Sequence, residues 1–296
     1  MPELHVEDRL LVTDATHFRD YILTRYTPRC DPKGALHPAS LLRHLLRQHH
    51  MLSCWPMLEG LRAVLGPEET VWGFKLGKAG ASLELYLYNF TSNGSGNRKS
   101  TTALAKALQP WLRFETTVEE TQPYFMCSFE VTAEGIANSD GGQFRIYVGT
   151  GEEAREPGGF SYRLEDGATA VENHYAFYRA DDPRAMQDAV RRVVASPRSG
   201  AQACWGTLLP KWLREDCFTV CYAVKPRADG LYYSRIGTDA LARFLARHGY
   251  GSIADVLRHH RQGFAALRWD LGFDYAASSS GTTSLAVDKI GIHGVW

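Results

Sequence analysis

Residues 218–236, FTVCYAVKPRADGLYYSRI, contain two β-rich runs joined by a turn. The turn is KPRADG (residues 225–230), in which proline presets φ and Asp-Gly accepts unusual backbone dihedrals. Side chains alternate between the two faces of a strand, so Tyr232 and Ser234 share one face of the second run. A capped amphipathic helix is expected directly afterwards, over residues 239–248. The stretch therefore predicts a unit of strand, turn, strand and helix.

Four other stretches of the chain show the same unit. Each pairs two runs of alternating apolar and polar residues, and amphipathic helices lie between most pairs. The expected strand pairs are residues 71–76 with 81–90, 124–131 with 143–149, 159–164 with 171–178, 218–224 with 231–236, and 267–275 with 285–295. The expected helices are residues 17–26, 39–48, 57–65, 101–112, 183–195, 205–214, 239–248 and 253–262. No helix is expected inside the second strand pair, only a glycine-rich connection.

These elements predict an α+β fold, in which five consecutive antiparallel hairpins close into a ten-stranded β-barrel surrounded by helices. The chain has no GxGxxG motif, no P-loop and no alternation of single strands with helices, so a parallel sheet is not expected. We interpret residues 1–296 as one domain, with a helical part over 1–66 and the barrel hairpins over 67–296.

Composition excludes several classes of function. The 296 residues carry a formal net charge of +0, which argues against nucleic-acid binding, since that needs a net basic face. Apolar runs are interrupted by polar residues and the amino terminus lacks the apolar core of a secretory signal, so no membrane span is expected. The six cysteines form no CxxC motif and predict reduced thiols in a cytoplasmic protein. The scattered histidines do not predict a metal site.

The alternation also separates two strand faces of different chemistry. Leu83, Leu85 and Leu87 share an apolar face that suits packing beneath helices. The opposite face is rich in tyrosine, with isolated charges and few lysines or glutamates; it carries Glu84, Tyr86, Tyr88, Arg145, Tyr147, Asn173, Tyr175, Phe177, Tyr232, Ser234 and Lys289. This composition favours a barrel lumen that holds a partly anionic, partly apolar ligand. The alternative is a half-exposed sheet with surface tyrosines.

The segment GLYYSRIGTDALARFLARHGYGSIADVLRHH (residues 230–260), followed by LRWDLGFDY and the last strand VDKIGIHGVW, resembles the carboxy-terminal third of the cyanobactin peptide prenyltransferases. These belong to the ABBA (αββα) prenyltransferases, whose fold is a ten-stranded antiparallel barrel surrounded by helices. The strand pairs match that fold over residues 70–296, with motif-level similarity over about 215–296 and, more weakly, 143–149. The first 65 residues match in helical character alone. The family has no Asp-rich metal motif, and neither has this chain.

The resemblance implies a monomeric, cytoplasmic enzyme that transfers an isoprenyl group from an allylic diphosphate, accompanied by Mg²⁺, to a macrocyclic or linear peptide. In the related indole enzymes, a basic residue, a spacer and a tyrosine hold the diphosphate and shield the allyl cation. Arg145 and Tyr147 fit this pattern in full, whereas Tyr175 and Tyr232 keep the tyrosine alone. Lys289 lies where related barrels carry a diphosphate-binding lysine. Preorganised cations there would stabilise the leaving diphosphate more in the transition state than in the ground state.

The acceptor must lose a proton, and Glu84 is the expected general base, with Glu130 as the second candidate. Either carboxylate can instead orient a cationic acceptor group. The family usually carries a glutamate on the first strand and an arginine on the second, whereas this chain has Trp72 and Phe74 on the first and Glu84 on the second.

Five residues are expected to line the prenyl and acceptor pocket, namely Trp72, Phe74, Tyr86, Ser234 and Trp269. The small Ser234 favours a longer prenyl tail and the bulky Trp269 a shorter one, so dimethylallyl and geranyl donors both remain open. Two other functions also remain open: an ABBA enzyme with a small aromatic or indole acceptor, and a non-catalytic barrel that binds an apolar ligand. For the enzyme, Arg145→Ala is expected to lower turnover far more than stability.

Overall fold

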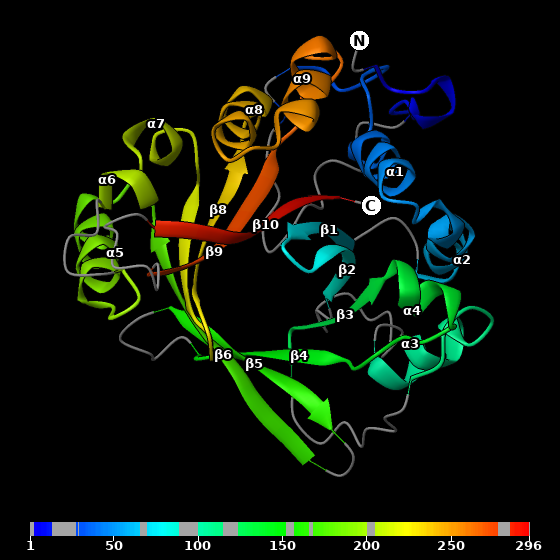
Figure 1. The fold of residues 1–296 in the computed structure, drawn as a ribbon, viewed down its shortest axis with the longest axis horizontal. Helices are drawn as coiled ribbons and strands as arrows, with labels where there is room; N and C mark the ends of the chain where they lie inside the picture. The colour runs from blue at the N-terminus through cyan, green and yellow to red at the C-terminus, as the bar shows by residue number, and fades with distance from the viewer. Residues whose placement is uncertain are drawn as a thin grey trace.

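Ten antiparallel strands form a closed barrel in which the last strand pairs with the first (Figure 1). The computed structural model describes residues 3–13, 28, 30–65, 70–88, 100–114, 124–151, 157–165, 168–199, 205–277 and 285–295. The strands are β1 (Thr70–Gly77), β2 (Gly80–Tyr88), β3 (Met126–Thr132), β4 (Arg145–Gly149), β5 (Gly158–Glu165), β6 (Ala168–Arg179), β7 (Thr219–Val224), β8 (Asp229–Ile236), β9 (Trp269–Ala277) and β10 (Leu285–Val295). The five predicted hairpins and the predicted barrel are confirmed.

Helices cover the outer face of the barrel, with α1 and α2 on one flank and α5 to α7 on the other (Figure 1). They are α1 (Pro38–Gln48), α2 (Trp55–Leu65), α3 (Thr101–Leu108), α4 (Ala133–Ala137), α5 (Pro183–Ala195), α6 (Trp205–Leu208), α7 (Lys211–Arg214), α8 (Thr238–Arg247) and α9 (Gly251–His259). Short 3-10 turns occur at η1 (Val6–Asp8) and η3 (Leu52–Cys54). No helix in the described part of the chain is both long and apolar enough to cross a bilayer.

Two helix predictions are corrected. α4 lies inside the second hairpin, where none was expected; the Thr132 hydroxyl caps it by accepting a hydrogen bond from the backbone N–H of Gly135. The helix expected over residues 205–214 is split into α6 and α7 at Pro210, whose ring cannot donate the hydrogen bond that a continuous helix needs. The helix expected over residues 17–26 lies outside the described residues.

The main hydrophobic core lies between the outer wall of the barrel and the helices. Leu83, Leu85 and Leu87 of β2 are fully buried in it, as their shared face predicts. Phe144 stacks on Phe114 with ring centroids 4.3 Å apart, beneath the segment that follows α3. Because this layer buries the apolar face of each strand, the opposite face of each strand is left to line the lumen.

Three aromatic residues that were expected in the lumen belong to this outer core instead. Trp72, Phe74 and Trp269 are each 0% exposed. The Trp72 and Trp269 rings meet edge to face at 6.2 Å, and Trp72 Nε1 donates to the Val295 carbonyl at 2.9 Å. Phe74 packs against the ring of His49, just beyond α1. The prediction that these three residues line the pocket is therefore wrong.

Strand alternation gives the reason for this error. On β1 the inward positions are held by Gly73 and Lys75, which places Trp72 and Phe74 under the helices. Bulky aromatic side chains suit a helix-covered core as well as a tyrosine-lined lumen, so residue type alone did not decide the direction.

Candidate active site

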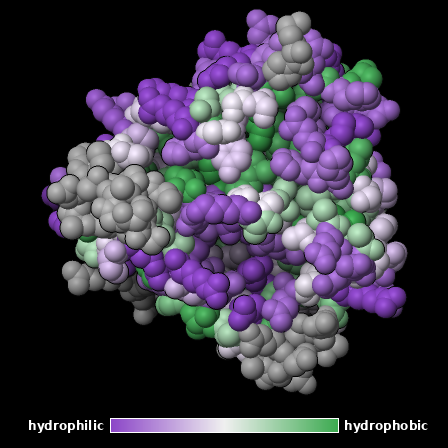
Figure 2. Space-filling model, in the orientation of Figure 1, coloured by the Kyte–Doolittle hydropathy of each residue, from purple (hydrophilic) through white to green (hydrophobic). Residues whose placement is uncertain are grey.

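The lumen is divided into two adjoining chambers of different chemistry. The charged chamber lies at the end of the barrel where the hairpins turn, holds about 530 Å³ and carries Lys75, Glu84, Glu130, Arg145, Glu172, Lys225, Asp274 and Lys289. The apolar chamber lies at the end where the helical connections begin, holds about 410 Å³ and carries mainly Val71, Tyr88, Phe125, Met126, Phe160, Phe177 and Phe218. Both volumes fall within the range of small-molecule sites. Over the centre of the barrel, Figure 2 shows a hollow bordered mostly by hydrophilic residues.

A closed ring of five aromatic side chains marks the junction of the chambers, and we call it the collar. It comprises Tyr86, Tyr147, Tyr175, Tyr232 and His293, one from the second strand of each hairpin. Neighbouring ring centroids around the collar are 6.3, 6.0, 6.4, 6.4 and 5.6 Å apart. The four tyrosines line both chambers. The recurrence of tyrosine at one register of the second strands thus reflects a single physical layer.

Lumen-facing glycines allow the collar rings to lie against the barrel wall. A Cβ atom on Gly73 would come within 2.9 Å of His293 Nε2 and 3.0 Å of the Tyr86 ring. A Cβ atom on Gly291 would come within 2.9 Å of His293 Cε1, and one on Gly272 would overlap the Tyr232 ring. Contacts this short do not occur for real Cβ atoms, so the absence of a side chain at these positions is a packing requirement.

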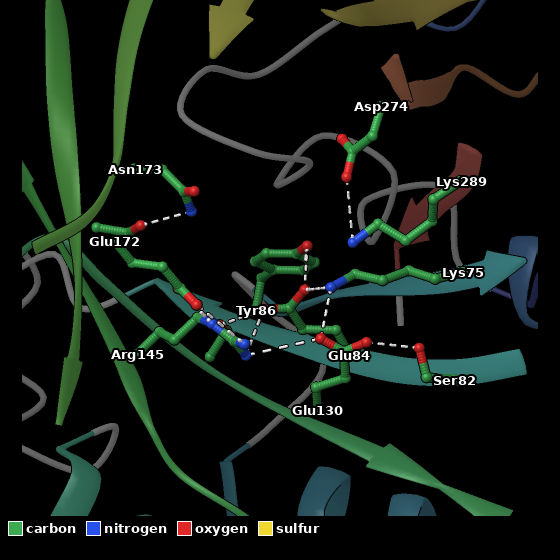
Figure 3. Close-up of polar contacts among 12 residues, drawn as sticks. Lys75, Ser82, Glu84, Tyr86, Glu130, Arg145, Glu172, Asn173, Asp274 and Lys289 are labelled. Atoms are coloured by element: carbon green, nitrogen blue, oxygen red, sulfur yellow. Dashed lines mark hydrogen bonds and ion pairs between the residues drawn. The ribbon is translucent and has the colours of Figure 1, made fainter. Parts of the chain in front are cut away.

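Lys75 and Glu84 form the buried centre of the charged chamber. The Lys75 ammonium contacts Glu84 and also donates to Glu130 Oε2 at 2.7 Å (Figure 3). Glu84 is only 2% exposed, and it accepts hydrogen bonds from the hydroxyls of Tyr86 and Ser128, each at 2.5 Å. Burial favours the neutral acid, but the charges of Lys75 and Arg145 outweigh it and hold the pKa of Glu84 well below its usual value. Glu84 is therefore an ionised carboxylate with little tendency to accept a proton.

Arg145 is surrounded by carboxylates. Its Nε lies 2.7 Å from Glu172 Oε2, and its Nη1 lies 3.6 Å from Glu130 Oε2 and 3.9 Å from Glu84 Oε1 (Figure 3). Burial opposes its charge, but Glu84 and Glu172 outweigh burial and raise its pKa. Arg145 thus compensates acidic side chains already present, which limits the positive charge that it offers to a ligand.

The opposite wall of the charged chamber has an excess of positive charge. Lys225 Nζ lies 2.5 Å from Asp274 Oδ1 and donates to the Tyr232 hydroxyl at 2.8 Å, while Lys289 Nζ lies 3.3 Å from Asp274 Oδ2. Two ammonium groups therefore share one carboxylate. Burial and the nearby Lys75 lower the pKa of Lys289, as expected for a cation without a counterion of its own.

The apolar chamber contains Ser234 and a side chain that strand alternation misplaces. Arg235 has a φ of +59° at the register shift between Tyr233 and Ile236, and it lines the chamber instead of the outer face. Its backbone N–H donates to Asp270 Oδ1 at 2.7 Å, and its guanidinium lies 4.3 Å from the Phe218 ring centroid. The contact with Phe218 places a cation at the edge of a mainly apolar chamber.

Among the described residues, no three His, Cys, Asp or Glu side chains are grouped so that they could hold a metal ion. The carboxylates of the charged chamber are all engaged by lysine or arginine. The described cysteines, at positions 30, 54, 127, 217 and 221, are free thiols, as expected; Cys204 lies outside the described residues.

Comparison with known proteins identifies the fold. No protein-family model matches the chain, and no curated protein matches its sequence. The solved structure of AnaPT from Neosartorya fischeri superposes with a TM-score of 0.54 and 11% sequence identity, covering 87% of this chain and 92% of that chain. The fold is the ABBA prenyltransferase barrel. At this identity the likeness concerns the fold, which by itself does not determine a substrate.

Most of the residues predicted from the sequence meet in the lumen of this ABBA barrel. Eight line the charged chamber or the collar, namely Glu84, Tyr86, Glu130, Arg145, Tyr147, Tyr175, Tyr232 and Lys289. Ser234 lines the apolar chamber, whereas Trp72, Phe74 and Trp269 line neither chamber. Ser234 favours a longer prenyl tail and Trp269 a shorter one. Because Trp269 lies outside the lumen, only the indication from Ser234 applies.

Other charged residues of the site and one collar residue were not predicted from the sequence. Lys75, Asp274 and His293 lie at alternating lumen positions of β1, β9 and β10, so strand alternation could have identified them. Lys225 belongs to the turn between β7 and β8, and its direction could not be read from an alternating pattern. Glu172 is the residue of β6 that the register with β5 skips, between the pair Ser161 with Asn173 and the pair Tyr162 with Val171, where simple alternation fails.

Proposed function

We propose that this chain is an ABBA prenyltransferase that moves a dimethylallyl or geranyl group from its diphosphate to a side chain of a ribosomal, cyanobactin-like macrocyclic peptide. The observation that carries the proposal is the junction of a cationic chamber and an apolar chamber at an aromatic collar. An allylic diphosphate has the same two halves, with a polyanion joined to a hydrocarbon tail. AnaPT, which shares the barrel, is itself an ABBA prenyltransferase.

The donor is proposed to bind with its diphosphate beside Lys225 and Lys289 and its tail passing through the collar into the apolar chamber. The excess positive charge around Asp274 would be compensated by the diphosphate. As the bond between C1 and oxygen breaks, its electron pair leaves with the diphosphate, and the two ammonium groups stabilise that developing charge. The reacting carbon then lies at the level of the collar.

The collar would protect the allyl cation from water. Burial and nearby charges raise the pKa values of Tyr86, Tyr147, Tyr175 and Tyr232, so all four remain neutral phenols at pH 7. Neutral aromatic rings attract a cation through their faces without reacting with it, and their packing excludes water from the reacting carbon.

We also propose that Mg²⁺ enters with the donor. The carboxylates of the charged chamber are already ion-paired, so the diphosphate oxygens and water would supply most of the ligands, in keeping with the preference of Mg²⁺ for phosphate and water. Chelation by EDTA should then lower turnover without changing the melting temperature of the ligand-free protein. A fall in that melting temperature would indicate a structural metal instead.

The peptide acceptor is supported by the resemblance of residues 230–260 and the two following segments to cyanobactin prenyltransferases. The aromatic lining of the apolar chamber supports a second candidate, a small aromatic or indole acceptor. The test is incubation with Mg²⁺ and dimethylallyl or geranyl diphosphate, together with cyclic hexapeptides that each contain one Tyr, Trp, His, Arg, Ser or Thr. Free tryptophan and indole are tested in parallel, and mass spectrometry measures the gain of one isoprenyl group.

A binding measurement separates both enzyme functions from the third alternative, a non-catalytic barrel. Geranyl diphosphate at about 100 times its dissociation constant should stabilise the protein by about 2.7 kcal/mol. Geraniol, which has the same tail without the diphosphate, is the matched control. Equal stabilisation by both ligands would contradict a diphosphate site and favour a barrel that binds apolar molecules.

A further inference from the structure

His293 differs from the other collar residues because it carries a basic nitrogen whose state is fixed by its neighbours. Its Nδ1 lies 3.2 Å from the carbonyl oxygen of Asp270. A carbonyl oxygen only accepts hydrogen bonds, so Nδ1 must carry the hydrogen. In the neutral ring, Nε2 then has an unprotonated lone pair. Among the described residues, no side chain or backbone group forms a hydrogen bond with Nε2.

The position of Nε2 places this lone pair near the junction of the chambers. The imidazole lies over Gly73 and Gly291, and its Cε1 and Nε2 atoms are the ones that a Cβ on Gly291 would approach, at 2.9 and 3.4 Å. Gly291 is the next lumen-facing residue of β10 toward the hairpin end of the barrel, where the charged chamber lies. His293 itself lines the apolar chamber, so Nε2 lies within the collar, where the two chambers meet.

The surroundings keep His293 uncharged. Its side chain is 6% exposed, and burial, reinforced by the charge of Lys75, lowers its pKa to about 4. The groups that face or contact it are Lys75 on β1, Glu84 and Tyr86 on β2, Lys225 beyond β7, Tyr232 on β8 and the Asp270 carbonyl on β9. At neutral pH the ring therefore has a free lone pair, which a protonated imidazole would lack.

We propose that His293 is the general base that removes the proton from the prenylated acceptor. The inference rests on the proposed function, because it assumes that the reacting carbon lies at the collar. The bond between C1 and the diphosphate oxygen breaks with its electron pair leaving on the diphosphate. An electron pair of the acceptor then forms the bond to C1, and the proton of the attacking atom passes to Nε2 of His293 while its bonding electrons return to the acceptor.

A weak base is sufficient for this step. An aromatic carbon or heteroatom that has gained an alkyl cation is strongly acidic, so its proton passes readily to a neutral imidazole. Glu84, the carboxylate expected in this role, already interacts with Lys75, Tyr86, Ser128 and Arg145. His293 differs from it in having a free lone pair at the collar, where the reacting carbon is proposed to lie.

The test compares His293→Phe and His293→Gln with the wild type. Phenylalanine keeps an aromatic face in the collar but has no lone pair, whereas glutamine can still donate to the Asp270 carbonyl but is not basic. Both variants should form at least tenfold less prenylated product from dimethylallyl diphosphate and whichever cyclic hexapeptide of the panel reacts with the wild type. Release of diphosphate and of free prenyl alcohol should continue, because the allyl cation still forms and is captured by water.

The ratio of prenyl alcohol to prenylated product distinguishes this role from simple shielding. A shielding role predicts that His293→Phe retains wild-type product, and that result would overturn the inference while leaving the proposed function intact. Thermal melting verifies that each variant is folded. His248→Phe, which replaces a ring that packs against Phe244 outside the lumen, is the matched control and should leave the ratio unchanged. If the wild type formed no product with any donor and acceptor, the proposed function would fail, and this inference with it.

Discussion

The two chambers of the lumen are built by the same strands and yet differ completely in chemistry. On β2 and β6, the residue two positions before the collar lines the charged chamber, and the residue two positions after it lines the apolar chamber. On β2 these residues are Glu84, Tyr86 and Tyr88, and on β6 they are Asn173, Tyr175 and Phe177. A spacing of two residues therefore converts position along a strand into depth within the barrel. A single aromatic layer, the collar, therefore separates the chamber proposed to neutralise the diphosphate from the chamber proposed to hold the prenyl tail away from water.

The largest expected effect comes from removing a cation on the positive wall of the charged chamber. Lys289→Met leaves Lys225 paired with Asp274 and removes the excess charge proposed to stabilise the leaving diphosphate. We expect kcat/KM to fall by about 10²- to 10³-fold, the usual effect of losing one preorganised charge-stabilising group. Lys78→Met is the matched control, because Lys78 also pairs with an aspartate, Asp288, but lies at the surface. Equal losses in both variants would contradict the assignment.

Arg145→Ala tests the side of the same chamber where carboxylates surround Arg145. The sequence alone predicts a loss of turnover with little loss of stability, but the structure places Arg145 among Glu84, Glu130 and Glu172. Without it, Lys75 alone would compensate Glu84 and Glu130. We expect the free energy of unfolding to fall by about 3 kcal/mol, because partly buried charges lose their partner. Chemical denaturation measures the change, and Arg145→Lys, which keeps the charge, should recover part of it.

The collar should make stability depend on pH. His293 has a folded-state pKa of about 4, below its usual 6.5, so the folded state binds this proton less readily than the unfolded state. The associated stability is complete above pH 6.5 and is lost as the pH falls through the folded-state pKa. Between pH 8 and pH 5 the wild type should lose about 2 kcal/mol more unfolding free energy than His293→Phe. Parallel denaturation curves for the two proteins at all pH values would contradict the buried neutral imidazole.

The smallest expected effect concerns the apolar chamber. Ser234→Phe would fill space that the prenyl tail is proposed to occupy. We expect kcat/KM for geranyl diphosphate to fall about tenfold relative to that for dimethylallyl diphosphate, a typical result of reshaping an apolar pocket. The control is Val224→Phe, on the exposed outer face of the neighbouring β7. A loss shared equally by both donors would argue that the longer tail does not reach Ser234.

Strand alternation and turn chemistry predicted the barrel and most of its lumen, because each hairpin has one face under helices and one face inward. The direction of Trp72 and Phe74 was not predictable in this way, since aromatic residues suit both faces of β1. Arg235 departs from the alternation that places Tyr232 and Ser234 on one face, because a left-handed backbone and a register shift interrupt the pattern at the end of β8. Such irregularities depend on tertiary pairing, which a local pattern does not encode.

The collar shows a second limit of sequence reasoning. Its four tyrosines were identified by their repeated position on the second strands, but the fifth member, His293, has a different side chain at the equivalent position. The glycines beneath the rings also indicate the position of the collar. Gly73, Gly272 and Gly291 occur inside strands, where glycine is otherwise unfavourable. Together they mark where neighbouring rings need room.

The pairing of β1 with β10 has a consequence for biosynthesis. Most of the chain separates β1, which begins at Thr70, from β10, which ends at Val295, so the sheet cannot close until β10 has left the ribosome. Until then the first hairpin exposes an edge with unpaired backbone groups, which favours association with other nascent chains. Contacts between such distant segments also slow folding. Expression at low temperature or with chaperones that shield open sheet edges should therefore improve the yield of native protein.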